Sequence, residues 1–274
     1  MSDIKYKKPL TIEEQIDYLE NNKRVVYNDC PKEQAKKILL QYNYINVITP
    51  YKHKFALKDN KGVTIRDEKN NHIYERDVDF NEYYQCYCNE RTNYPIIYKN
   101  IMKFETTFNA VLSYKIIHYY NISSNASFLT FINDLHTNLS FLKSQEKYKQ
   151  STINHMNAEI DKLIEDMNRY KSIYILMDRI SLSTAITIFR SCNIQLRRHI
   201  FQTLLSFDST VGYKTFESFD DFLTRLPSVR NFVCHFNSLE VLVNYLYIPT
   251  KKLRTPTDRK KYLNIIRKLS INEE

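Results

Sequence analysis

The chain has 274 residues, a net charge of +9 and a pI near 9.1, and 43% of its residues are apolar, which excludes a disordered protein and is sufficient for a buried core. It contains only two glycines, Gly62 and Gly212, which excludes P-loop and dinucleotide-binding folds because both place glycines where the backbone approaches phosphate. Scarce glycine and long stretches without proline favour a mostly α-helical fold. The basic excess indicates either an anionic partner, most commonly nucleic acid, or a solubilising charge spread evenly over the surface.

The sequence carries no sign of secretion, membrane insertion or metal binding. The opening "MSDIKYKKPL" lacks the apolar centre of a signal peptide, and no apolar run reaches the roughly 20 residues of a membrane span. The five cysteines are odd in number and irregularly spaced, which is typical of a reduced, cytoplasmic protein. Cys86 and Cys88 near His72 lack the usual spacing of zinc ligands, so we expect neither a metal nor a cofactor.

The N-terminal part, residues 1–94, is predicted to be a small helical region with one irregular segment. A first helix starts at "PLTIEEQIDYLENN", where Thr11 and Glu14 form a capping box. A second starts at "NDCPKEQAKKILLQYNY", with Asp29 as the cap and Pro31 in the first turn. Residues 51–80 lose the helical period, and "FALKDNKGVTI" provides the candidate for a short β-hairpin around Asn60.

A helical bundle is predicted over residues 95–250. Helical period is clear at 94–120, 181–207 and 218–226, whereas 124–145 is read as either a helix or an irregular connection. Between them, apolar residues at alternating spacings of three and four predict one long helix with a heptad-like seam that faces the core or a second protomer. These residues are Ile153, Met156, Ile160, Leu163, Met167, Tyr170, Tyr174 and Met177. Residues 251–274 form a basic tail, either an RNA-binding arm or merely a charged end.

The stretch "RLPSVRNFVCHFNSL" at 225–239 carries the strongest candidate site. Pro227 disfavours helix at the residue before it, so we expect a new helix to begin there, with Arg230 in or near its first turn, beside free N–H groups suited to phosphate. Asn231 and His235 are four apart and share a helix face, whereas Arg230 lies about 140° from His235. One copy therefore makes an incomplete site, and two facing copies would surround a single phosphate. The alternative for His235 is a partly buried histidine that satisfies a backbone carbonyl.

Several of these stretches resemble known families. Arg230-x4-His235 at the start of an apolar helix is similar to the HEPN ribonuclease motif. "KKPLTIEEQIDYL", "LLQYNYINVITPYKHKF" and "VRNFVCHF" resemble Abi-like abortive-infection proteins of the AbiD/AbiF type, and "IMKFETTFNAVLSYKI" places Glu105 at the family's glutamate position. The chain departs from the family where Cys234 directly precedes His235. It also departs at "CNERTNYPIIY", so the resemblance assigns no role to Arg91. The resemblance covers roughly residues 8–245.

The resemblance implies a HEPN-like bundle and a toxin-like, metal-independent endoribonuclease of phage defence, working as a homodimer and held inactive by a structured noncoding RNA antitoxin. His235 would transfer protons, Arg230 would stabilise charge on the phosphate, and Asn231 would orient His235 or the phosphate. Glu105 would hold Arg230 through an ion pair, or simply pack. The predicted RNA contacts are Arg197, Arg198, Lys251, Lys252, Arg254, Arg259, Lys260 and Lys261, although Arg197 and Arg198 also fit a solvated helix face.

Two rival functions fit the same sequence. A non-catalytic RNA-binding protein would keep the HEPN-like fold and the basic charge without turnover, since a fold does not prove an activity. A helical protein–protein adaptor would use the seam at 153–177. The Arg230 and His235 pair favours the enzyme, and the basic tail favours RNA under the first two readings.

Overall fold

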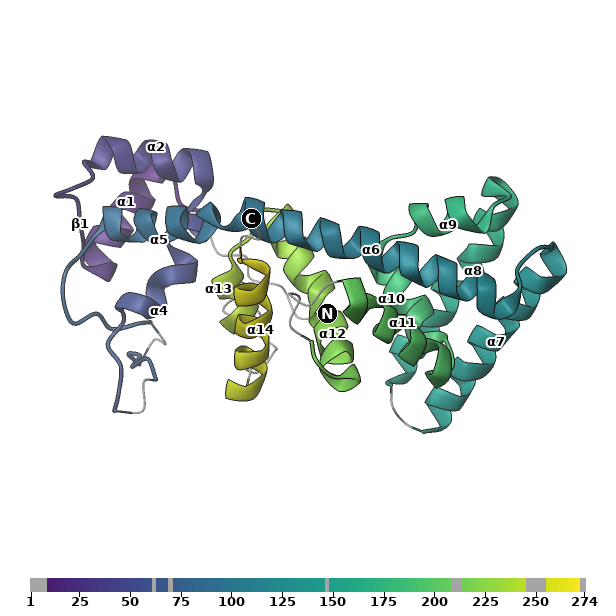
Figure 1. Ribbon diagram of the computed structural model, residues 1–274. Helices are drawn as coiled ribbons and strands as arrows, with labels where there is room; N and C mark the ends of the chain where they lie inside the picture. Colours follow the sequence, from purple (N-terminus) through teal and green to yellow (C-terminus); the bar gives the residue numbers. More distant parts are fainter. Residues whose placement is uncertain are drawn as a thin grey trace, which may run out of the picture. The chain divides into compact units, whose positions relative to one another are not determined.

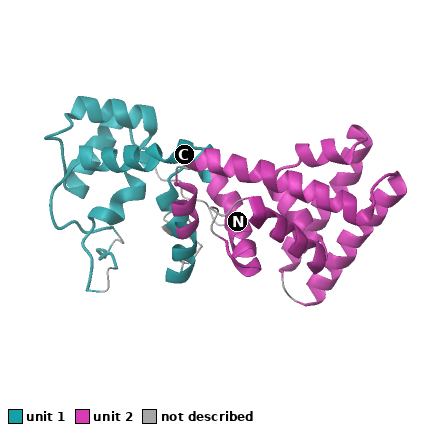
Figure 2. Cartoon of the chain, viewed as in Figure 1, with its two compact units in different colours: residues 1–95, 232–263 teal, residues 96–231, 264–274 magenta. Residues whose placement is uncertain are grey.

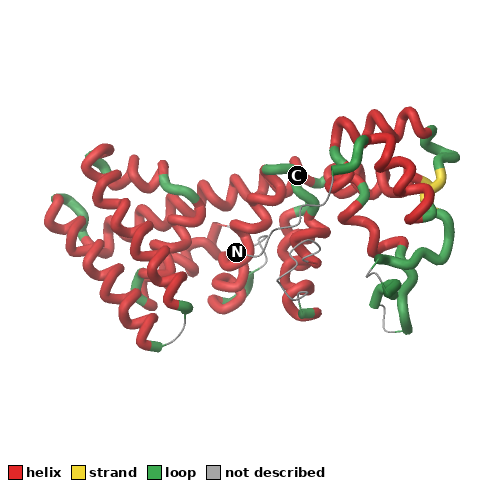
Figure 3. The backbone as a smooth tube through the Cα atoms, turned by 180° about the vertical axis from the view of Figure 1, so that it is seen from behind, coloured by secondary structure: helices red, strands yellow, loops and turns green. Residues whose placement is uncertain are grey.

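The structure is a computed structural model that describes residues 9–60, 63–68, 71–145, 148–207, 213–244 and 255–271. The described chain is mostly helical, as predicted, and its named strands form one short parallel pair (Figures 1 and 3). It divides into two compact units (Figure 2): unit 1 comprises residues 1–95 and 232–263, and unit 2 comprises residues 96–231 and 264–274. Residues from 232 onward within the predicted bundle of 95–250 fall in unit 1, and the predicted domain bounds remain predictions.

The first helices of unit 1 begin at different kinds of cap. Helix α1 (Ile12–Lys23) has the predicted capping box, since Thr11 Oγ1 accepts from the Glu14 N–H and the Glu14 carboxylate accepts from the Thr11 N–H. Helix α2 (Lys32–Tyr42) starts directly after Pro31 without a side-chain cap, so the prediction that Asp29 caps it is wrong. The N–H groups of Asn28 and Asp29 instead donate to the Asp79 carboxylate, at 2.7 and 3.1 Å.

The remaining elements of unit 1 surround one hydrophobic core, which they share with α1 and α2. Strand β1 (Val25–Val26) pairs in parallel with β2 (Val78–Asp79), a pairing that the sequence did not predict. Unit 1 also contains helices α3 (Tyr44–Val47), α4 (Lys52–Phe55), α5 (Phe80–Thr92) and α13 (Leu239–Asn244) and a 3-10 turn (Thr49–Tyr51). The buried core is made of Ile16, Leu19, Val25, Cys30, Ala35, Ile38, Leu39, Val47, Ile48, Tyr51, Val78, Phe80 and Tyr83.

The segment in which a hairpin was predicted has three extended stretches instead of two. Isolated antiparallel bridges join Lys58 to Thr64, Arg66 to His72, and Ala56 to Tyr74. Backbone hydrogen bonds connect the stretches in a ring, because Leu57 donates to Ile73, Ile73 to Ile65, and Ile65 to Leu57. The turn predicted at residues 60–62 is described only at residue 60, and the other two positions lie outside the described residues.

Unit 2 is built on the long helix α6 (Tyr94–Tyr120), predicted at these residues and buried at Phe104, Phe108 and Leu112. Helix α7 (Asn125–Ser144) packs against α8 (Gln150–Tyr170), and α10 (Leu182–Ser191) packs against both (Figure 1). Residues 124–145, left open by the sequence, are thus mainly helical. The predicted helix of 181–207 is broken near Cys192, so that α11 (Ile194–Phe207) is a separate element.

The apolar residues in the first half of the predicted seam are buried, but the seam does not run along one long helix. Lys171 has a left-handed backbone (φ 54°) that ends α8, and α9 (Ile173–Arg179) follows in a new direction. Ile153, Met156, Ile160 and Leu163 are buried, whereas Tyr174 is 54% exposed. The seam residues of α8 therefore pack in the core of unit 2, and its continuation past the break is interrupted.

A single helix, α12 (Phe216–Cys234), occupies the region where two helices were predicted. Pro227 lies inside it, so the prediction that a new helix begins there is wrong. A proline inside a helix costs about 3 kcal/mol because it removes one hydrogen bond and crowds the preceding turn. Leu223, Leu226, Val229 and Val233 line one buried face on both sides of Pro227, and their burial offsets that cost.

The C-terminal segment is folded where the structure describes it. Helix α14 (Pro256–Leu269) buries Tyr262, Ile265 and Leu269. Asn100 Nδ2 on α6 donates to the backbone oxygens of Leu269 and Ile271, both at 2.9 Å. The predicted tail is therefore in large part a packed helix. Within the described residues, no helix combines the length and apolar character needed to cross a bilayer.

Candidate functional site

The turn that follows α12 carries His235. Cys234 is the last helical residue, and Phe236 takes a left-handed backbone (φ 51°). The Phe236 N–H donates to the Val233 oxygen at 3.1 Å and the Asn237 N–H to the Phe232 oxygen at 2.8 Å. These paired bonds form the C-terminal capping motif in which glycine is usual at the left-handed position, here taken by phenylalanine. His235 is thus the capping residue of α12, not a residue in the middle of a helix.

This geometry corrects the expected surroundings of Arg230. Arg230 lies just before the last turn of α12 instead of in the first turn, near the end where the carbonyl groups are free and the helix dipole is negative. No N-terminal N–H groups of that helix are therefore available there to bind a phosphate. Arg230 is half-buried and its Nε atom has no hydrogen-bond partner, while Asn231 and His235 are exposed. The argument that Asn231 and His235 share a helix face does not apply, since the helix ends between them.

We call residues 235–238 the His235 turn, and three side chains from the end of α5 and the start of α6 bind it within unit 1. Arg91 Nη2 donates to the Phe236 oxygen at 2.9 Å, and Tyr94 Oη donates to the Asn237 oxygen at 2.7 Å. Ser238 Oγ donates to the Glu90 carboxylate at 2.8 Å. The backbone of the turn is therefore fixed, whereas none of the described hydrogen bonds or ion pairs involves the His235 side chain.

The groups that hold the turn are themselves buried and mutually bonded. The side chain of Glu90 is 12% exposed and that of Arg91 is 8% exposed. Tyr51 donates to the Glu90 carboxylate and accepts from Arg91 Nη1 at 3.1 Å. The Arg91 guanidinium also lies 3.7 Å from the centre of the Tyr87 ring. Burial and the charge of Glu90 raise the pKa of Tyr51 above its ordinary value, so it remains a hydrogen-bond donor at neutral pH.

Glu240, at the start of α13, is the centre of a second group of ion pairs. Its N–H donates to Glu90 at 2.9 Å, and its carboxylate contacts Lys54 Nζ at 3.0 Å and His53 Nε2 at 3.5 Å. Burial opposes ionisation of Glu240, but hydrogen bonds and charge from His53 and Lys54 outweigh that effect and lower its pKa to about 2.

Glu240→Gln is expected to destabilise the protein at pH 7 by roughly 3 kcal/mol and to have little effect near pH 2. The unfolded carboxyl titrates near its ordinary value of 4.5, so the stabilisation is complete above that pH and is lost as pH falls toward 2. Urea unfolding of both proteins between pH 2 and pH 7 measures the difference. A pH-independent difference would contradict the assignment of the low pKa to Glu240.

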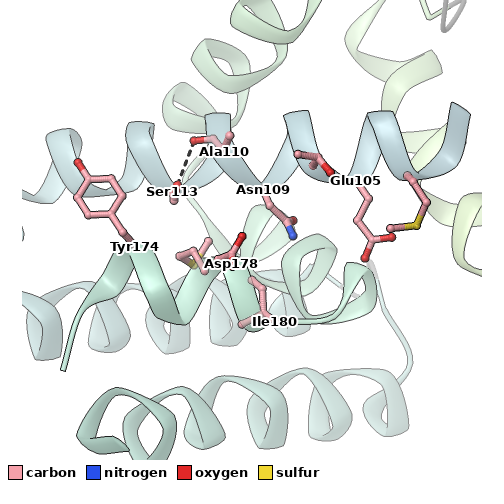
Figure 4. A pocket seen from close by; sticks show the side chains of 10 residues that line it. Glu105, Asn109, Ala110, Ser113, Tyr174, Asp178 and Ile180 are labelled. Carbon is pink, nitrogen blue, oxygen red and sulfur yellow. Dashed lines mark hydrogen bonds between the residues drawn. The ribbon is translucent and has the colours of Figure 1, made fainter. Parts of the chain in front are cut away.

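Glu105 contributes to a cavity and makes no ion pair with Arg230 within the described residues. The cavity has a volume of about 350 Å³ and lies between α6 and α9 (Figure 4). Glu105 Oε2 and Asn109 Oδ1 are buried without hydrogen-bond partners, and Asp178 faces them from α9. The described contacts include no ion pair between Glu105 and Arg230, and the Glu105 carboxylate lines this cavity.

The predicted RNA contacts fall into three groups. Arg197 is 5% exposed, lies against the rings of Phe189 and Phe216, and pairs with Asp220, which corrects its predicted place on a basic surface. Arg198, Arg259 and Lys260 are exposed, and Lys261 is partly buried. The predicted contacts Lys251, Lys252 and Arg254 lie outside the described residues.

Sequence reasoning missed Glu90, Arg91 and Tyr94. Their partners are about 145 residues away along the chain, and the spacing of nearby residues cannot indicate such long-range contacts. The sole sequence signal was "CNERTNY" itself, which places a Glu–Arg pair among residues that become buried. Because this stretch departs from the family pattern, no role was predicted for the pair.

The family described as Abi-like protein matches residues 37–239, which is most of the chain and includes α5, α6, α12 and the His235 turn. No curated protein and no solved structure matches the chain. Because the match extends over well more than half of the sequence, the chain belongs to the family of Abi-like proteins.

Proposed function

We propose that this protein is a metal-independent endoribonuclease of the HEPN type that acts in abortive infection. Membership of the Abi-like family suggests a role in phage defence. The observation that supports a nuclease is the exposed His235 on a fixed turn, five residues after Arg230 and within the matched segment. An imidazole whose ring makes no hydrogen bond within the described residues is available for proton transfer to a bound substrate.

The proposed reaction uses the substrate's own hydroxyl as the nucleophile. The ribose 2′-oxygen forms a bond to the adjacent phosphorus, and the bond from phosphorus to the 5′-oxygen breaks. One imidazole takes the proton of the 2′-hydroxyl, another proton goes to the leaving 5′-oxygen, and the products carry a 2′,3′-cyclic phosphate and a 5′-hydroxyl. Histidine suits both transfers because its ordinary pKa lies near neutral pH. Arg230 stabilises the charge that develops on the phosphate, and Asn231 orients the phosphate or the imidazole.

The two proton transfers support a homodimer. The His235 turn of one chain carries a single imidazole, and a composite site made from two chains supplies two. Suppose that both imidazoles are required, and that wild type is mixed with an equal amount of inactive His235→Ala subunits. After subunit exchange, the mixture should have about a quarter of the activity of the same total amount of wild type. Independent chains would give half. This ratio follows from random pairing and needs no knowledge of the target RNA.

The direct test compares cells that express wild type with cells that express His235→Ala. We expect slowed growth and new RNA ends, with 2′,3′-cyclic phosphate and 5′-hydroxyl groups, in the wild-type cells alone. Sequencing of RNA ends captured by their terminal chemistry measures this. Identical ends and equal growth in both strains would refute the nuclease and would favour a non-catalytic RNA-binding protein.

A structured noncoding RNA is the proposed inhibitor. The net charge of +9 supports an RNA partner, and the exposed Arg198, Arg259 and Lys260 are candidate contacts. RNA that co-purifies with His235→Ala protein should contain one dominant sequence. Recovery of random cellular fragments alone would contradict a dedicated RNA antitoxin.

A further inference from the structure

We infer that Glu90 and Arg91 are positioning residues for His235, an inference that rests on the proposed function. They touch neither the imidazole nor the reacting atoms. They fix the backbone of the His235 turn, and the turn sets the direction in which the imidazole leaves the end of α12.

The first step of the argument is the backbone of the turn. Phe236 occupies the left-handed region, which is sterically unfavourable for a bulky residue and persists where surrounding contacts enforce it. The two capping bonds of α12 provide part of that enforcement. The bond from Arg91 to the Phe236 oxygen, at 2.9 Å, acts on the strained residue itself.

The second step is the continuity of the contacts along the turn. Arg91 binds the oxygen of Phe236, Tyr94 binds the oxygen of Asn237, and Glu90 binds the side chain of Ser238 and the N–H of Glu240. Successive residues after His235 are therefore fixed, and the imidazole is left exposed. A catalytic group needs this combination, since a displacement of about 1 Å can lower a rate about 100-fold.

The third step is the chemistry of the groups that hold the turn. A buried Glu–Arg pair adds little net stability compared with apolar residues of similar volume, and its effect is to demand one arrangement of hydrogen bonds. Here Tyr51 donates to Glu90 and accepts from Arg91, so that both charged groups are tied to the same hydroxyl. The pair therefore fixes one geometry of the turn instead of merely filling space.

The two charged residues have different tasks. The guanidinium of Arg91 bonds to the turn through Nη2 and to Tyr51 and the Tyr87 oxygen through Nη1, and lysine has no such fork. Glu90 accepts bonds from Tyr51, Ser238 and Glu240 at once, which requires a carboxylate. Arg91→Lys and Glu90→Gln thus alter the geometry while conserving size.

The test measures the turn and the reaction separately. Hydrogen exchange of the amides at 235–240 should become at least 10-fold faster in Arg91→Lys and Glu90→Gln. Cleavage of a short single-stranded RNA should show kcat reduced about 10- to 100-fold with KM changed less than about threefold, because positioning is altered and the RNA-binding surface is retained. Ser238→Ala loses the hydrogen bond to Glu90 and should show a smaller change in both measurements. This variant still allows the test if Arg91→Lys and Glu90→Gln fail to fold.

Arg76→Lys is the matched control, since Arg76 forms an exposed pair with Glu82 on the same unit and makes no described contact with the turn. It should leave both measurements unchanged. Faster exchange with an unaltered kcat would overturn the positioning role, as would unaltered exchange in all three variants. If wild type cuts no RNA, the proposed function fails and the positioning role fails with it, whereas the exchange data still report whether Glu90 and Arg91 fix the turn.

Discussion

Purified His235→Ala protein is expected to cut RNA about 10²- to 10⁴-fold more slowly than wild type, which is the usual contribution of general acid–base catalysis. The physical reason is the loss of the exposed imidazole from a turn whose backbone is otherwise held by α5 and α6. Because that side chain makes no described hydrogen bond, its removal should leave the free energy of unfolding nearly unchanged. Free imidazole added to the variant should restore part of the rate, since the truncated side chain leaves room for it.

His155→Ala is the control for this prediction. His155 is an exposed histidine on α8, which belongs to unit 2, and no catalytic role is assigned to it. It should retain the wild-type rate. An equal loss of rate in both variants would mean that the effect comes from the change in net charge or from protein preparation. An undiminished rate in His235→Ala would exclude His235 as the proton-transfer group.

Asp220→Ala is expected to lower the free energy of unfolding by about 3–5 kcal/mol, the range for a buried ion pair that loses one partner. Asp220 Oδ1 lies 3.3 Å from Arg190 Nε and 3.3 Å from Arg197 Nη2. Arg197 is 5% exposed, and its guanidinium lies 5.0 Å from the centre of the Phe189 ring and 5.1 Å from that of the Phe216 ring. Removal of the carboxylate leaves this cation in an apolar setting without its counter-charge, beside a second arginine.

Glu217→Ala is the matched control, because Glu217 is an exposed acidic residue one turn earlier on α12. Its loss removes a favourable charge at the helix N-terminus and should cost no more than about 1 kcal/mol. Urea unfolding followed by circular dichroism measures both variants. A cost below 1 kcal/mol for Asp220→Ala would show that the two arginines do not depend on it.

Local sequence patterns predicted the features that depend on neighbouring residues. The capping box at Thr11 and Glu14 and the α6 helix at 94–120 follow from hydrogen bonds and periodicity within a few residues, and both were confirmed. The resemblance to Abi-like proteins was confirmed as well, because it rests on several stretches read together. The roles of Arg230, Asn231 and His235 remain predictions, to be tested by the experiments above.

The errors have a common physical cause. Pro227 signals a helix boundary locally, but the buried face formed by residues on both sides of it keeps α12 continuous. Lys171 carries no sequence sign of a break, yet its left-handed backbone divides the predicted seam. Arg197 looks like part of a basic surface until Asp220, 23 residues later, pairs with it. In each case tertiary packing overrides a local preference worth a few kcal/mol at most.

The sequence by itself determined that the protein is mainly helical, basic and Abi-like, since composition, periodicity and motif are properties of the chain. The tertiary structure alone decided where His235 stands: at the end of α12, on a turn held by Glu90, Arg91 and Tyr94. Those contacts join segments about 145 residues apart. Nothing in the local free energy of either segment specifies them, and they form only when both segments pack into the same unit.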